Sequence, residues 1–142
     1  MAAERRADVV WEGDLFDGSG TIVSNTSGAL PQLPVSWHSR AEDPEGRTSP
    51  EELIAAAHAS CFAMALSLEL AQAGHPPERL ETSATVTFQP GEGIKGSALT
   101  VRGTVPGISE DEFLKAADAA KAGCPVSQAL SVEITLDAQL AA

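Results

Sequence analysis

Apolar positions along the chain gather in one long central segment, EELIAAAHASCFAMALSLELAQAG, which ends at Gly74. Ser49 and Pro50 precede it and form a typical helix start, and Glu52, three residues after Ser49, completes a predicted capping box. We therefore expect a helix of about 24 residues, roughly 35 Å long. Because its middle is apolar on every side, this helix must be surrounded, and a second copy of the chain would supply part of the cover.

Shorter segments in which apolar and polar residues alternate predict strands on both sides of this helix. A hairpin and a third short strand come before it, and two strands, a second helix and a last strand come after it. This order predicts an α+β fold with an antiparallel sheet and a long buried central helix. The expected strands span residues 7–11, 21–24, 35–38, 80–89, 98–105 and 130–136, with turns at 17–20 and 91–96 and a helix from Ser109 to about residue 123.

Composition and charge narrow the classes of protein to which the chain can belong. Its 142 residues, 43% of them hydrophobic, fit a single domain spanning 1–142. A net charge of −11 disfavours binding to nucleic acid or to an anionic membrane surface. The most apolar run, 53–68, is interrupted by His58 and is too short for a membrane span, and the N-terminus has no apolar signal region. These features predict a soluble, cytoplasmic protein.

Two cysteines, 63 positions apart and outside any CxxC motif, are the candidate chemical residues. Cys61 lies in the middle of the apolar helix, where burial would raise its pKa, so a reactive Cys61 needs a nearby cation. Arg40 and Arg47, in the segment before the helix, are the best placed in sequence. Cys124 lies in AGCPVSQAL at a helix exit, where a sulfur can be held ready to meet another one. On composition alone, an inert cysteine in a turn is the favoured interpretation of Cys124.

The segments around the two cysteines resemble those of a known family. TSPEELIAAAHASCFAMALS and KAGCPVSQALSVEITLDAQL are similar to the OsmC (osmotically inducible protein C) family, which is related to the organic hydroperoxide resistance (Ohr) proteins. The likeness also includes WEGDL near the start and VPGIS at 105–109, so it covers nearly the whole chain in the same order. The resemblance implies an α+β fold, an intertwined homodimer with active sites at the dimer interface, and thiol peroxidase activity.

The same resemblance implies a role for four residues. Cys61 matches the peroxidatic cysteine and Cys124 the resolving cysteine, while Arg40 matches the arginine that activates the thiolate and Glu51 the family's glutamate. Glu51 can orient Arg40 through a paired, charge-assisted hydrogen bond. Arg47 is an additional cation that leaves the choice of arginine open, and a departure at position 41, alanine in place of an aromatic residue, leaves the shape of the substrate pocket open.

The implied reaction uses the two sulfurs in turn. The Cys61 thiolate displaces an alcohol from a hydroperoxide and becomes a sulfenic acid, which Cys124 converts to a disulfide. An external dithiol restores both thiols, and the resemblance implies a lipoyl-type reductant. The apolar helix favours organic hydroperoxides over hydrogen peroxide as substrates. No metal, haem or other cofactor is expected.

The helix geometry adds an inference about the dimer. Glu51 and Cys61 are ten residues apart on one helix, so about 15 Å separates them. One arginine cannot readily reach both within one chain. If Glu51, Arg40 and Cys61 form one site, we expect Glu51 to come from the partner subunit.

Two other functions compete with the peroxidase interpretation. His58 and Cys61 lie at i and i+3 on one helix face, and with Cys124 they could hold a metal, but zinc needs a fourth ligand and neither His38 nor His75 has motif spacing. His58 is therefore interpreted as a core or interface histidine. The second rival is a stress-induced binding protein that has lost catalysis, and the presence of both cysteines and an arginine argues against it.

Overall fold

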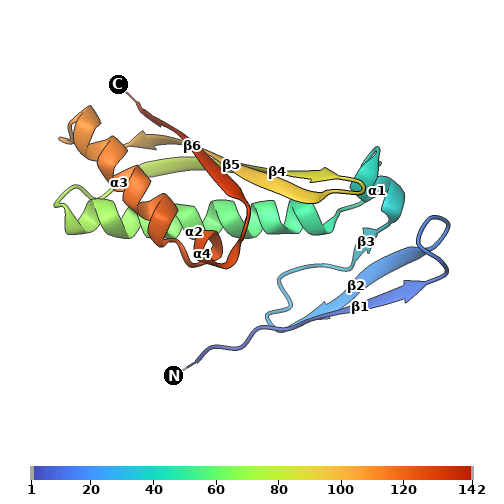
Figure 1. Cartoon of the computed structure of the whole chain (residues 1–142). Coiled ribbons are helices and arrows are strands. Elements are labelled where there is room, and N and C mark those ends of the chain that lie inside the picture. Colours follow the sequence, from blue (N-terminus) through green and yellow to red (C-terminus); the bar gives the residue numbers. More distant parts are fainter. Residues whose placement is uncertain (1, 142) are drawn as a thin grey trace. The chain divides into compact units, whose positions relative to one another are not determined.

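The computed structural model describes residues 2–141 and divides into two compact units, one that ends at Leu53 and one that begins at Ile54. The first unit carries a three-stranded antiparallel sheet with the order β1-β2-β3, followed by a short helix (Figure 1). The predicted hairpin is confirmed. The elements of this unit are β1 (Ala7–Glu12), β2 (Ser19–Asn25), β3 (Leu33–Val35) and α1 (Trp37–Ala41).

The third strand ends earlier than predicted, because its last expected residues form α1. Ser36 starts this helix with a capping box in which its side chain accepts from the Ser39 N–H. The polar Ser–x–x–Ser pattern therefore overrides the strand preference of the preceding residues. The prediction of a strand over 35–38 was wrong after Val35, because Ser36 is the N-cap of α1 and both Trp37 and His38 lie in this helix.

The long helix α2 (Pro50–Gln72) begins and ends close to the predicted positions. The Glu52 N–H donates to Ser49 Oγ at 3.2 Å, so Ser49 is the N-cap. The other half of the capping box is replaced, because the Glu52 carboxylate accepts from the Thr48 hydroxyl at 2.7 Å. Gly74, with φ of 88°, takes the left-handed conformation that ends the helix, as its position in the sequence predicts.

The second unit builds a three-stranded sheet with the order β4-β5-β6, against which α2 and α3 pack (Figure 1). β4 and β5 are antiparallel, but β5 and β6 are parallel, so the prediction of a purely antiparallel sheet was wrong here. A parallel neighbour needs a crossover connection, and the helices between β5 and β6 provide it. The elements are β4 (Arg79–Gln89), β5 (Gly93–Thr104), α3 (Glu110–Gly123), α4 (Pro125–Ala129) and β6 (Glu133–Leu140).

The core of this unit lies between the sheet and the two helices. Only one face of α2 is buried, and on the opposite face Met64 and Leu68 are 74% and 57% exposed. The sequence predicted a helix that is surrounded on all sides. Within a single chain, only one face of α2 is covered. By length and composition α2 could also cross a membrane, which is weak evidence for a span because core helices of soluble proteins share this property. One face of α2 packs into the core of this unit. The fully buried core side chains include Phe62, Leu66, Leu70, Leu99 and Phe113.

Gly103 of β5 lies directly against Phe113 of α3. A Cβ atom built at Gly103 would lie 2.6 Å from Cε1 and 2.8 Å from Cζ of the buried Phe113 ring. Gly103→Ala should therefore destabilise the protein by about 1–3 kcal/mol through overpacking, as measured by urea unfolding. Gly123→Ala is the matched control, because nothing lies within 4 Å of the position of its Cβ. Equal stability of the Gly103→Ala variant and the wild type would contradict this account of the packing.

Candidate active site

The two cysteines differ in their access to solvent. Cys61, on α2, is partly exposed, whereas Cys124 has 0% of its surface exposed, and both are free thiols. Cys124 lies at the junction of two helices, where it is the C-cap of α3 and the N-cap of α4. Its backbone N–H donates to Ala120 O at 2.9 Å, and the following Pro125 is the first residue of α4. The chain thus holds the second sulfur at a fixed, enclosed position.

The two sulfur atoms lie close enough to hydrogen-bond. The Cys61 thiol donates to the Cys124 sulfur, and the backbone N–H of Val126, in α4, donates to the Cys61 sulfur. The residues are 63 positions apart in the sequence, so it is the packing of α2 against the α3–α4 junction that brings them together. The two thiols are therefore neighbours in the folded chain.

The surroundings of the two thiols shift their pKa values in opposite directions. Burial raises the pKa of Cys61, the hydrogen bond that it donates to Cys124 raises this pKa further, and the Val126 N–H opposes both effects. Burial also raises the pKa of Cys124, but the hydrogen bonds from Cys61 and from Ser127 outweigh it and leave this pKa below its usual range. These contacts lower the pKa of Cys124 and raise that of Cys61, so the surroundings of Cys61 within this unit do not themselves favour its thiolate.

His58, one turn before Cys61 on α2, is completely buried and hydrogen-bonded at both ring nitrogens. Nδ1 lies 2.7 Å from Ser97 Oγ and Nε2 lies 2.8 Å from Ser127 Oγ. Burial lowers the pKa of His58 and favours the neutral ring. Because both nitrogens are engaged by hydroxyls, His58 has no lone pair directed at a metal, and residues 2–141 contain no cluster of three or more metal-ligating side chains. The interpretation of His58 as a core histidine agrees with these contacts.

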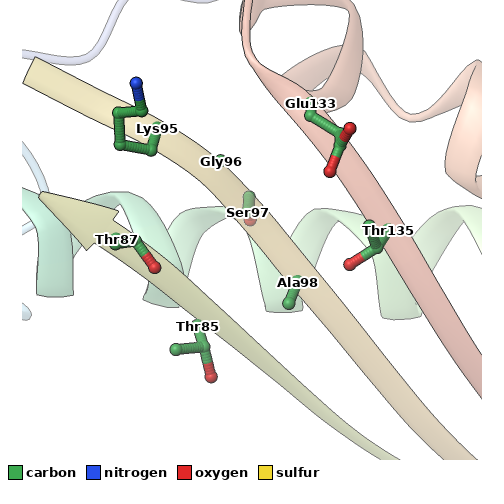
Figure 2. A pocket seen from close by; sticks show the side chains of 8 residues that line it. All are labelled: Thr85, Thr87, Lys95, Gly96, Ser97, Ala98, Glu133 and Thr135. Atoms are coloured by element: carbon green, nitrogen blue, oxygen red, sulfur yellow. The ribbon is translucent and has the colours of Figure 1, made fainter.

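Strand β5 directs Ser97 toward the histidine. Ser97, drawn behind the β5 ribbon in Figure 2, directs its hydroxyl to His58 on the α2 side of the sheet, and the next residue, Ala98, faces the other side. That other side carries a shallow depression of about 260 Å³ lined by polar residues such as Thr85, Thr87 and Thr135. No sulfur atom lines it, so the thiol chemistry belongs to the helix side. Sequence reasoning did not identify Ser97 or Ser127, since no local motif marks them.

Arg40 and Glu51, both within the first unit, form a bidentate ion pair. Arg40 Nε lies 3.0 Å from Glu51 Oε1, and Arg40 Nη2 lies 2.9 Å from Glu51 Oε2. The Glu51 side chain is 7% exposed and that of Arg40 is 31% exposed. The structure thus contains the predicted pair, and both members belong to the same chain. If Glu51 serves a cysteine of a partner subunit, Arg40 accompanies it. Arg47 is exposed and follows the turn at Gly46.

Comparison with known proteins identifies the family. The family model described as OsmC-like protein matches residues 42–138. Peroxiredoxin OsmC of Escherichia coli (strain K12) is 48% identical over 143 residues, which cover 99% of this chain and 99% of the relative. Organic hydroperoxide resistance protein OhrA of Bacillus subtilis (strain 168) is 34% identical over 113 residues, covering 77% of this chain and 76% of the relative.

Solved structures agree in fold. An OsmC-like protein from Mycoplasma pneumoniae has a TM-score of 0.74 at 17% identity and covers 100% of both chains. The organic hydroperoxide resistance protein OhrB of Bacillus subtilis has a TM-score of 0.62 at 22% identity, covering 96% of this chain and 98% of that one. The fold and the site define an α+β protein with one accessible and one enclosed thiol in contact. The chain belongs to the OsmC family, as its cysteine segments predicted.

Proposed function

We propose that this protein is a thiol peroxidase that reduces organic hydroperoxides to alcohols in the cytosol. The observation that carries the proposal is the contact between a partly exposed sulfur, Cys61, and an enclosed one, Cys124. A hydroperoxide can reach the first sulfur from solvent, whereas the second can react only with the first. The relatives named peroxiredoxin and organic hydroperoxide resistance protein support the same activity.

The proposed reaction has three steps: attack on the peroxide, formation of the disulfide and reduction of the disulfide. The Cys61 thiolate attacks the outer oxygen of ROOH, the O–O bond breaks, and the alkoxide takes up a proton to leave as ROH. Cys61 is then a sulfenic acid, and Cys124 attacks its sulfur, forming the disulfide and releasing water. An external dithiol finally reduces the disulfide by two thiol–disulfide exchanges and is itself oxidised. For this last step we propose a lipoyl-type dithiol.

The Arg40–Glu51 pair is proposed as the source of the missing positive charge. Contacts near Cys61 raise its pKa, so the attacking thiolate needs a guanidinium nearby. About 15 Å of helix separates Glu51 from Cys61 in the same chain, which favours a pair supplied by the partner of a homodimer. The exposed face of α2 at Met64 and Leu68 gives such a partner an apolar surface to cover. Glu51 holds the guanidinium in a fixed orientation.

The substrate preference can be tested by direct consumption assays. With dihydrolipoamide as the reductant, the wild type should consume cumene hydroperoxide at least about tenfold faster than H₂O₂, because apolar contacts with the alkyl group add binding energy. Residual peroxide is measured by ferric–xylenol orange colour at matched concentrations. Absence of consumption would refute the peroxidase proposal. Equal rates for both peroxides would refute the proposed preference for organic substrates.

A further inference from the structure

A continuous hydrogen-bond chain connects β5 to the enclosed sulfur. Ser97 Oγ contacts His58 Nδ1, His58 Nε2 contacts Ser127 Oγ, and Ser127 in turn donates to the Cys124 sulfur through its hydroxyl and its backbone N–H. The three residues that form this hydrogen-bond path are buried, with exposed fractions of 2% for Ser97, 0% for His58 and 8% for Ser127. Burying three polar groups in one line is costly unless they bond to each other, so their arrangement around a reactive thiol needs a reason.

The hydrogen-bond path can carry a proton in either direction, toward Cys124 or away from it. Neutral imidazole has one donor and one acceptor nitrogen, so one serine hydroxyl must donate to His58 and the other must accept from it. In one sense Ser97 donates to Nδ1, Nε2–H donates to Ser127, and the Ser127 hydroxyl donates to a Cys124 thiolate. In the reverse sense a Cys124 thiol donates to Ser127, whose hydroxyl donates to Nε2. Transfer of two protons along this path converts the thiol into the thiolate.

The enclosed sulfur needs such a path at one step of the cycle. In the reduced protein the thiol of Cys61 donates to the Cys124 sulfur, and this contact lowers the pKa of Cys124. Oxidation of Cys61 to the sulfenic acid removes this S–H donor, and a proton-accepting path is needed in every molecule in which Cys124 is then a thiol. The proton must leave before Cys124 can attack, and water cannot take it because no part of Cys124 is exposed to solvent.

We propose that His58, acting through Ser127, accepts the proton of Cys124 when Cys124 attacks the oxidised Cys61. Ser127 Oγ takes the proton from the thiol and passes its own to Nε2, which makes His58 an imidazolium whose Nδ1–H is held by Ser97. The Cys124 thiolate forms the S–S bond and the S–O bond of the sulfenic acid breaks. The hydroxide leaves on the side of the Cys61 sulfur opposite Cys124 and takes a proton from solvent to become water. The proton on His58 returns by the same path to Cys124 when the disulfide is reduced. His58 is a relay residue, because it reaches the reacting sulfur only through Ser127. The inference extends the peroxidase proposed above.

The resolution step can be measured without any hydroperoxide. 5,5′-Dithiobis(2-nitrobenzoate) reacts at the accessible Cys61 and releases one thionitrobenzoate, after which Cys124 attacks the mixed disulfide and releases a second one. The two releases are followed at 412 nm by stopped flow. His58→Gln should slow the second release by about 100-fold and leave the first release unchanged, since positioned general bases contribute at least that much.

Two serine variants complete the design. Ser127→Ala removes one oxygen atom and so interrupts the path. This variant should also show the slow second release. It provides the test if His58→Gln does not fold. Ser83→Ala, on an exposed position of β4, is the matched control and should behave as the wild type. A second release at the wild-type rate in either folded relay variant, or an equal slowing of both releases, would overturn the relay. A protein that consumes no hydroperoxide but needs His58 for the second release would refute the peroxidase and leave the relay intact.

Discussion

Cys61→Ser should reduce peroxide consumption to the uncatalysed background, because a serine hydroxyl at this position is far too weakly acidic to attack a peroxide. The substitution exchanges one sulfur for one oxygen at a partly exposed position, so the free energy of unfolding should change by about 1 kcal/mol or less. Consumption is measured with cumene hydroperoxide and excess dithiol, and folding is checked by circular dichroism. Turnover at an appreciable fraction of the wild-type rate in Cys61→Ser would mean that another group attacks the peroxide.

Cys124→Ser is the paired variant that separates attack from resolution. It should consume one equivalent of peroxide per protein and then stop, leaving Cys61 as a sulfenic acid that dimedone traps and mass spectrometry detects. The order of the two roles follows from access, since peroxide can reach Cys61 and not Cys124. The reverse pattern, with one equivalent consumed by Cys61→Ser and none by Cys124→Ser, would exchange the two roles.

Arg40→Ala should destabilise the protein much more than Glu51→Ala. Loss of Arg40 leaves the carboxylate of Glu51, which is only 7% exposed, buried without its partner, and such changes cost about 3–5 kcal/mol. Loss of Glu51 leaves a guanidinium that is 31% exposed and can turn toward water, so a cost of about 1 kcal/mol is expected. Urea unfolding of the two variants measures the difference. Equal losses of stability would contradict the asymmetry in burial.

The activity of the same variants tests the role of the ion pair in catalysis. Glu51→Ala should remain folded and slow peroxide reduction on the order of 100-fold, because the guanidinium loses its fixed orientation. Unchanged activity in Glu51→Ala would remove Glu51 from the site. Arg47→Ala discriminates between the two cations that precede α2: a large loss of activity in this variant, with normal activity in Arg40→Lys, would transfer the activating role to Arg47.

Local signals in the sequence were sufficient for most elements of the fold. The cap at Ser49 and the left-handed Gly74 delimit α2, and alternation along 80–89 marks β4, because these features depend only on neighbouring residues. The parallel placement of β6 depends instead on how α3 and α4 carry the chain back across the sheet, which no local pattern records. The apolar middle of α2, in contrast, did indicate that a single chain would not cover the helix completely, and one face is exposed within the single chain.

The site was only partly predictable for a related reason. Cys61 and Cys124 could be singled out because distinctive segments surround them, and Arg40 and Glu51 are eleven positions apart across one loop. Ser97 and Ser127 lie 39 and 69 positions from His58, and serine is too common in sequences for its identity to suggest a role. Only the crossing of β5, α2 and α4 converts three ordinary polar residues into one connected path.

The complete enclosure of Cys124 also gives the regeneration of the enzyme a direction. In the proposed cycle, a dithiol can approach the disulfide only from the side of Cys61, so the transient mixed disulfide is expected on Cys61, with Cys124 as the leaving sulfur. The donors around Cys124 stabilise the negative charge that develops on it as the S–S bond opens. A bulky reductant that needs to reach only the Cys61 sulfur can therefore reduce the proposed disulfide, whereas one that must contact both sulfurs at once cannot.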